Sequence, residues 1–414
     1  MSRTRSGNPR SDLPPVIVLG GGANTLSIGR SLAKLGVDVY SIGAAPYLRY
    51  SRFLRPISPG PSGDLERAWA ECLLGPATDH LIGAVVLAAS DVGITVLAHN
   101  RQAMLERFNL DISNVNAQLN MLDKLATYQS SKKAGVPTPR FWEVHSWSEV
   151  ERHREELVFP LIVKPLHSHA YAAAFPGRSK FRVAHNMDDL KDAYSELTMA
   201  GLAIMLVEKI AGPDDLLCSY YTYIDTSGSP TFDFTKRILR RYPPNMGVAS
   251  YHITDWNPAV RDVAQRLFKH VGLRGVANAE FKLDRRDGQL KIIECNARFT
   301  DATPLLAASG IDLARYVYLQ VLRRPDPPPQ RYVTGRRLLY LSNDVLAYRE
   351  LRRCGELTLS SYVSSLAHKQ TFGYLSPRDP LPALARGVMR IKSVLTGHFF
   401  EGRRSSTVEP NRPL

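Results

Sequence analysis

Apolar, strand-like runs alternate with helical patterns over the first hundred residues, and no other feature constrains the fold of this chain as strongly. PVIVLGG precedes a helical pattern through Arg30 to Leu35, VDVYSIG follows, and LIGAVVLAA precedes a second helical pattern. Strands that alternate with helices usually form a parallel sheet. Residues 15–112 therefore predict an α/β domain on a parallel sheet.

The loop after the first strand, GGGANTLSIGRSL, is rich in glycine. It does not match the dinucleotide pattern G-x-G-x-x-G, because Thr25 stands where the third glycine belongs. The second strand ends in Ser41-Ile42-Gly43, without an acid to hold a ribose hydroxyl. A tight strand-to-helix turn and a loop that binds a small ligand both remain open.

A new domain is expected to start at about Asn116, and it mixes helices with antiparallel strands. NAQLNMLDKLATYQSSKKAGVPTPRF predicts a helix that ends at Gly135 and then an extended segment. The further expected elements are the strand FPLIVKP, a helix from Met187 to Met199, the strand IMLVEKI, a meander of CSYYTYID and TFDFTKRILRRY, a helix from Asn257 to Val271, and a hairpin over residues 275–299.

The segment PDPPP at 325–329 predicts an extended linker to a C-terminal extension. Amphipathic patterns predict helices there at about Leu338–Leu351 and Leu381–Leu395. The polar ends of the chain, residues 1–14 and 401–414, are expected to be disordered tails.

The chain has 414 residues and a formal net charge of +14. Its arginines are spread along the whole sequence, and no aromatic-interleaved basic motif of the RRM or KH type occurs, so nucleic acid is not expected as a partner. No apolar run is long enough to span a bilayer, and the basic N-terminus lacks the apolar core of a secretory signal. The four cysteines have no C-x-x-C spacing, which argues against a zinc site or a disulfide framework and for a reducing, cytoplasmic location.

The predicted hairpin GVANAEFKLDRRDGQLKIIECNARF is the most informative segment for function. Period-2 alternation sends Ile293 and Cys295 to one face of its second strand and a larger set to the other. That larger set is Leu290, Ile292, Glu294, Asn296 and Arg298.

A turn centred near Asp287 places Glu280 and Glu294 opposite each other, with Cβ atoms ~5 Å apart. Like charges this close are destabilising unless a cation lies between them, and Mg²⁺ prefers carboxylate and amide oxygens. The hairpin therefore predicts a metal site of Glu280, Glu294 and Asn296. The alternative is a polar strand that faces solvent, which the flanking apolar FKL and KII disfavour.

The segment AEFKLD…LKIIECNARF resembles the metal-binding signature of the ATP-grasp superfamily, and further pieces follow in the family's order. Lys124 and Lys164 match the two lysines that contact nucleotide phosphates. EKIAGPDD resembles the adenine hinge, which implies Glu208 on the adenine amino group, Lys209 and Ile210 near the ring, and Asp215 on the ribose.

This resemblance covers about residues 15–322 and implies the ATP-grasp fold. It divides the chain into an N-terminal Rossmann-like pre-ATP-grasp domain (15–115), a lid subdomain (116–195), a large subdomain with the ATP and metal site (196–324), and a small helical C-terminal extension (325–400). The fold class is α/β, with α+β character in the ATP-binding part.

One segment departs from the family pattern. The loop that covers the phosphates is usually rich in glycine, whereas HSHAYAAAFPGRSK has alanines, two histidines and Gly177. His167 and His169 lack a third nitrogen or sulfur ligand, so polar contacts within the loop are expected of them rather than zinc binding.

The strand TFDFTKRILRRY carries four cations, and strict alternation puts Lys236 and Arg240 on one face and Arg237 and Arg241 on the other. Together with Arg298, these residues are candidates to hold an acyl phosphate or an acidic substrate. The segment resembles the substrate loop of carboxylate-amine ligases of the D-aspartate ligase kind. The alternative is a solvated basic edge strand.

The resemblance implies a reaction that uses ATP and Mg²⁺, which Mn²⁺ could replace. A carboxylic acid would be activated as an acyl phosphate and joined to an amine, with release of ADP and phosphate. Two alternatives stay open: a carboxylase that uses bicarbonate or carbamate, and a nucleotide-binding regulator without turnover. A homodimer is compatible with these features.

Overall fold

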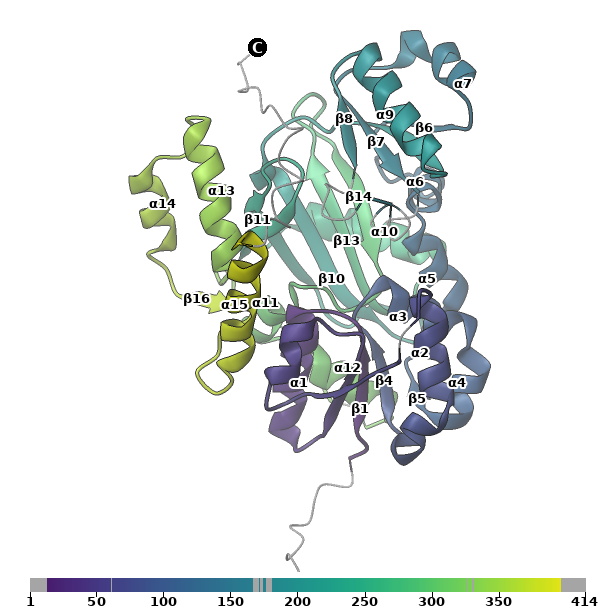
Figure 1. Cartoon of the computed structure of the whole chain (residues 1–414), viewed down its shortest axis with the longest axis vertical. Helices are drawn as coiled ribbons and strands as arrows, with labels where there is room; N and C mark the ends of the chain where they lie inside the picture. Colours follow the sequence, from purple (N-terminus) through teal and green to yellow (C-terminus); the bar gives the residue numbers. More distant parts are fainter. Residues whose placement is uncertain are drawn as a thin grey trace, which may run out of the picture.

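The strands of the protein form three sheets, which Figure 1 shows in the computed structural model. The structure describes residues 13–60, 62–166, 171, 174–175, 181–324, 326–329 and 331–395. Within these residues no helix is both long enough and apolar enough to cross a membrane.

The N-terminal sheet is parallel, as predicted, with the order β3-β2-β1-β4-β5. All four residues of β1, VIVL, are buried, as expected of a strand covered on both faces. Its strands are β1 (Val16–Leu19), β2 (Val39–Ile42), β3 (Arg55–Ile57), β4 (Val85–Ala88) and β5 (Asn109–Leu110), and its helices are α1 (Ala23–Leu32), α2 (Leu65–Leu74), α3 (Asp91–His99) and α4 (Arg101–Arg107).

A four-stranded antiparallel sheet follows, with the order β6-β9-β7-β8. The strands are β6 (Phe141–Val144), β7 (Leu161–Pro165), β8 (Arg182–Ala184) and β9 (Ile204–Glu208), and the helices are α7 (Trp147–Arg152) and α9 (Met187–Met199). The helix α9 has the predicted bounds. The single helix predicted up to Gly135 is two helices, α5 (Val115–Leu122) and α6 (Lys124–Lys133), because Asp123 caps the second one.

The strand pairing and core packing do not follow the predicted subdomain bounds at residues 116, 195 and 196. These bounds remain predictions. The strand β9 lies beyond residue 195 yet pairs with both β6 and β7. The helices α5 and α6 pack in one core cluster with the large sheet through Met121 and Tyr128.

The third sheet has seven strands in the order β14-β13-β10-β11-β12-β15-β16 and contains the predicted meander and hairpin. Its strands are β10 (Leu217–Ile224), β11 (Phe234–Tyr242), β12 (Val248–Thr254), β13 (Gly275–Leu283), β14 (Leu290–Asn296), β15 (Arg337–Leu339) and β16 (Gln370–Phe372). The amphipathic helix α10 (Pro258–Val271), capped by Asn257, buries Leu267 and Phe268 against the hairpin residue Phe281.

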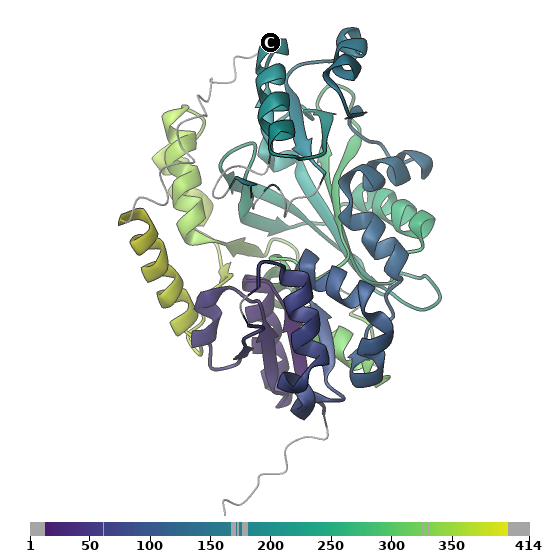
Figure 2. The same cartoon turned by 45° about the vertical axis from the view of Figure 1, so that its right-hand side comes forward.

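The predicted C-terminal extension adds two strands to this sheet as well as helices. The strand β15 pairs with β12, and β16 pairs with β15. Its helices are α13 (Leu341–Arg353), α14 (Leu359–Leu366) and α15 (Leu381–Leu395). Figures 1 and 2 place them on the opposite side of the molecule from α5 and α6.

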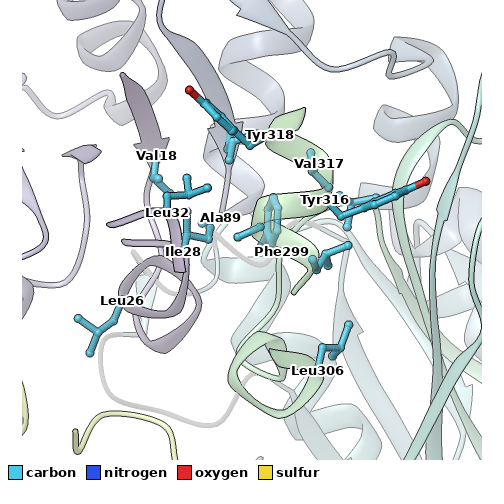
Figure 3. Packing of buried hydrophobic residues seen from close by; sticks show 14 of the residues in the cluster. Val18, Leu26, Ile28, Leu32, Ala89, Phe299, Leu306, Tyr316, Val317 and Tyr318 are labelled. Carbon is cyan, nitrogen blue, oxygen red and sulfur yellow. The ribbon is translucent and has the colours of Figure 1, made fainter. Parts of the chain in front are cut away.

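One hydrophobic cluster joins the N-terminal sheet to the segment after the hairpin. The helix α1 packs on α11 (Thr303–Ala308) and α12 (Leu313–Val321). Figure 3 shows three members of this cluster: Leu32 of α1, Val317 of α12, and Phe299, which follows the hairpin. Its burial fixes the first domain against the end of the hairpin.

Candidate functional site

One row of residues crosses the seven-stranded sheet from its edge to β12. Successive strands pair these residues in register. Glu294 of β14 pairs with Glu280 of β13, and Glu280 pairs with Ser219 of β10. Ser219 pairs with Lys236 of β11, which pairs with Thr254 of β12. Residues paired in this way share a face of the sheet. The predicted pairing of the two glutamates is confirmed, and we call this side of the sheet the carboxylate face.

The predicted division of β14 between its faces was wrong in part. A register shift lies between Glu280 and Phe281, so Phe281 pairs with Ile292 and Ile293 has no partner in the register. Such a bulge reverses the alternation. Leu290 and Ile292 therefore pack in the core cluster with Cys295, away from Glu294. Cys295 is a buried apolar side chain, as predicted, and burial raises the pKa of its thiol.

The next row brings Asn296 beside Glu294. Asn296 pairs with Asn278, and its Nδ2 donates to Glu294 Oε1 and Asn278 Oδ1, both at 3.3 Å. The described residues contain no cluster of three or more His, Cys, Asp or Glu side chains that could hold a metal. Two carboxylates and an amide fit Mg²⁺ in donor type, and their role as metal ligands stays a prediction.

Lys236 is a buried cation of the carboxylate face. Its side chain is 1% exposed, and Nζ donates to Ser219 Oγ at 3.0 Å. Burial lowers the pKa of Lys236, whereas the negative charges of Glu280 and Glu294 act in the opposite direction. A buried ammonium beside two carboxylates is suited to receive a phosphate or acyl phosphate oxygen.

Arg237 and Arg240 of β11 do not share this face, whereas a shift of the register returns Arg241 to it. The prediction that Lys236 and Arg240 lie on one face was wrong, because the register shifts between Ile238 and Arg240. Arg240 pairs with Tyr251 and makes a bidentate ion pair with the buried Asp344 of α13, at 2.9 and 2.8 Å.

The two remaining arginines of β11 also have acidic partners. Arg237 lies 3.2 Å from Asp255, and Arg241 lies 2.7 Å from Asp214. Roles of Arg237 and Arg240 in substrate binding stay predictions, and their observed contacts are structural.

Lys124 and Lys164 meet at the end of β7. Lys124 Nζ donates to the carbonyl of Leu166 at 3.3 Å, and Lys164 Nζ lies 5.4 Å from the centre of the Tyr128 ring. Tyr128 donates its hydroxyl to the carbonyl of Ile293, next to Glu294. These contacts place Lys164 beside Tyr128, which hydrogen-bonds to the edge strand β14 of the hairpin, and Lys124 beside the end of β7.

The predicted adenine hinge joins β9 to the hairpin turn. Glu208 is 5% exposed and lies 2.9 Å from Arg286 and 3.6 Å from Arg140. Arg286 also donates to the carbonyl of Lys209, and Lys282 donates to that of Ile210. Burial lowers the pKa of Lys282 to about 8. Glu208 thus has cationic partners, and its contact with adenine stays a prediction.

Asp215, the predicted ribose ligand, is exposed on the turn Asp214–Leu216. It lines a cavity of about 550 Å³ together with Arg240, Arg337 and serines of α14. Its role stays a prediction. The predicted phosphate loop, with His167, His169 and Gly177, lies outside the described residues.

Arg298 follows the carboxylate row at the end of the hairpin. Its Nε donates to Asp91 Oδ1 of α3 at 2.6 Å. Burial alone would lower the pKa of this guanidinium, but Asp91, Glu294 and Asp301 together raise it. Arg298 is therefore a charged guanidinium that lies between Glu294 and the N-terminal domain.

Sequence patterns did not reveal two buried polar residues near this site. Asn24, 2% exposed, donates to the carbonyls of Ala89 and Phe299 and so pins the glycine-rich turn to the end of the hairpin. His252 of β12, 5% exposed, has no hydrogen-bond partner of good geometry on either ring nitrogen within the described residues. The sequence could have placed His252 on the carboxylate face only if the pairing of β12 with β11 had been known.

Comparisons with known proteins agree with this geometry. The sequence model described as "Carbamoyl-phosphate synthase L chain, ATP binding domain" matches residues 252–321. The chain is 22% identical over 316 residues to a D-aspartate ligase of Enterococcus faecium, which covers 73% of this chain and 75% of that protein.

Solved structures with similar folds include a synthetase and a ligase. An N5-carboxyaminoimidazole ribonucleotide synthetase in complex with ADP superposes with a TM-score of 0.60 at 12% identity, over 80% of this chain and 82% of that one. An L-amino acid ligase from Bacillus licheniformis superposes with a TM-score of 0.57 at 17% identity, over 79% of each chain. The predicted fold is confirmed, and so is the resemblance on which it was based.

Proposed function

Because this chain has the ATP-grasp fold, we propose that it is an ATP-dependent ligase that activates a carboxylate as an acyl phosphate and joins it to an amine. The observation that carries this proposal is the row across the carboxylate face, in which two in-register glutamates lie on the same face as a buried lysine. This is a site for phosphate charge that needs no nucleophilic side chain.

The proposed reaction has two steps. An oxygen of the substrate carboxylate attacks the γ-phosphorus of ATP, and the bond from that phosphorus to ADP breaks. The amine then attacks the carbonyl carbon of the acyl phosphate, phosphate leaves with the electron pair of the C–O bond, and the nitrogen loses a proton.

In the first step Lys124 and Lys164 would hold the phosphates, and Lys236 and Arg298 would neutralise charge that develops on the transferred group. Glu280, Glu294 and Asn296 would bind Mg²⁺, which would offset the charge of the phosphate oxygens. The hinge residues Glu208, Lys209 and Ile210 and the acid Asp215 would position the nucleoside.

The test is ADP release by the purified chain with MgATP, measured against a panel of carboxylic acids and amines with mass analysis of the products. We expect release that depends on an acid, and the loss of at least 99% of it in Glu294→Gln. The exposed Glu356→Gln is the matched control.

Three outcomes separate the candidate functions. Unchanged ADP release in Glu294→Gln would contradict the metal assignment. Release with bicarbonate alone would favour the carboxylase. Nucleotide binding without any acid-dependent release would favour the regulator.

A further inference from the structure

Three segments that are far apart in the sequence meet at Gly22, just before α1. A Cβ atom added to Gly22 would lie 3.3 Å from the hydroxyl of Tyr47, 3.6 Å from that of Tyr374 and 3.9 Å from Asp301 Oδ1. Tyr47 belongs to the N-terminal domain, Asp301 follows the hairpin, and Tyr374 belongs to the C-terminal extension. Their oxygens converge where the backbone has no side chain.

Arg386 of α15 completes this group. Its guanidinium lies 4.3 Å from the centre of the Tyr374 ring and 6.0 Å from that of Tyr47. It donates to Ser342 Oγ at 2.9 Å, which uses one of the five N–H donors of a guanidinium. The group therefore contains a cation beside two phenols that can donate or accept.

The charge of opposite sign belongs to Asp301. This residue is exposed, and its negative charge raises the pKa of Tyr340 and Tyr374 in addition to the larger effect of their burial. It also acts on Arg298, three residues earlier. Asp301 thus interacts both with Arg298, at the end of the carboxylate row, and with the tyrosines.

We propose that Gly22, Tyr47, Asp301, Tyr374 and Arg386 bind the amine substrate, and that this substrate is an amino acid. Asp301 accepts from its ammonium group, while Arg386 and the two phenols hold its carboxylate. The proposal rests on the proposed ligase function and adds that the C-terminal extension supplies two residues of the amine site.

The charges of the group support this assignment. A carboxylate and a guanidinium near the same two phenols match a zwitterion, and a fork of N–H donors suits a carboxylate. Aromatic faces also favour an ammonium group. A simple amine would offer no negative charge to Arg386, for which the described residues show no salt bridge, and a simple acid would face Asp301.

Hydroxylamine separates the two half-reactions in the test. It is a small neutral nucleophile that traps an acyl phosphate as a hydroxamate and requires neither Asp301 nor Arg386. The amine screen pairs each amino acid with its decarboxylated amine, such as alanine with ethylamine. The matched control is Arg390→Gln on the same helix, because Arg390 also donates to Ser342.

For the wild-type protein we expect hydroxamate formation and a preference for amino acids over the paired amines. In Arg386→Gln the KM for the amino acid rises at least tenfold, the preference over the amine is lost, and hydroxamate formation stays within twofold. Tyr374→Phe shows the same pattern more weakly. Asp301→Asn raises the KM for both nucleophiles, and Arg390→Gln changes neither.

The possible failures are distinct. The absence of hydroxamate from the wild-type protein would contradict the ligase function itself. Hydroxamate formation that falls in parallel with amide formation in Arg386→Gln, or an unchanged KM for the amino acid, would overturn the amine site while leaving the ligase function standing. A wild-type preference for the decarboxylated amine would overturn it as well.

Discussion

His252 is a buried histidine whose ring lies beside that of Tyr340, with centres 6.1 Å apart. Burial, and then the charge of Lys236, hold its pKa well below the usual range, and a weak interaction with the backbone of Ala249 acts in the other direction. The ring therefore stays neutral in the folded protein at a pH at which the unfolded chain binds a proton.

This difference predicts a loss of stability in acid. Below pH ~6.5 the unfolded state holds one more proton at His252, which lowers the free energy of unfolding by about 1.4 kcal/mol per pH unit. In His252→Leu the fall in Tm from pH 7.5 to pH 5 should be smaller than in the wild-type protein. The exposed His270→Gln should keep the full fall, and an unchanged slope in His252→Leu would contradict the assignment.

The helix α13 is held to the large sheet by the ion pair of Asp344 with Arg240, whose side chains are 0% and 7% exposed. Asp344 also accepts from Ser250 of β12. Removal of one partner from a buried pair leaves the other charge without compensation. We expect Asp344→Asn to lower the free energy of unfolding by about 3–5 kcal/mol, measured by urea denaturation.

A double variant tests at the same time whether Arg240 binds substrate. Arg240→Met with Asp344→Leu replaces the pair with apolar groups and should recover most of the lost stability. Recovered stability with full acid-dependent ADP release would make Arg240 structural. Recovered stability without that activity would support its predicted role in the site.

The sequence predicted most elements but not their exact register. Counting from a turn centred near Asp287 correctly paired Glu280 with Glu294. Period-2 alternation failed across the two bulges, because it placed Ile292 on the face of Glu294 and Arg240 on the face of Lys236. A bulge is one extra residue without a strong sequence signal, and it reverses every later side chain.

At the scale of the whole molecule, Asp379 fastens the C-terminal extension to the N-terminal domain. It is 2% exposed, pairs with Arg30 at 3.1 Å, and accepts from the hydroxyl of Ser51 and the amide of Arg52. Periodicity predicted the helix α15 with its observed bounds, but these contacts are not local and left no pattern in the sequence.

Asp379→Asn should loosen this junction. We expect faster cleavage within residues 370–395 in limited proteolysis and a higher KM for the amino acid, with hydroxamate formation retained. Asp262→Asn, at an exposed aspartate on α10, is the matched control. Cleavage at the wild-type rate together with an unchanged KM would count against the junction as a support of the site.

Arg30 and Asp379 are 349 residues apart. A ribosome adds about 5–20 residues per second, so roughly 17–70 seconds pass between the synthesis of the two partners. During this time the first domain is on the nascent chain without Tyr374 and Arg386. The proposed amine site is therefore complete only after Arg386 has been synthesised, and a chain that stops before residue 374 would still contain every predicted ATP ligand but would lack two residues of that site.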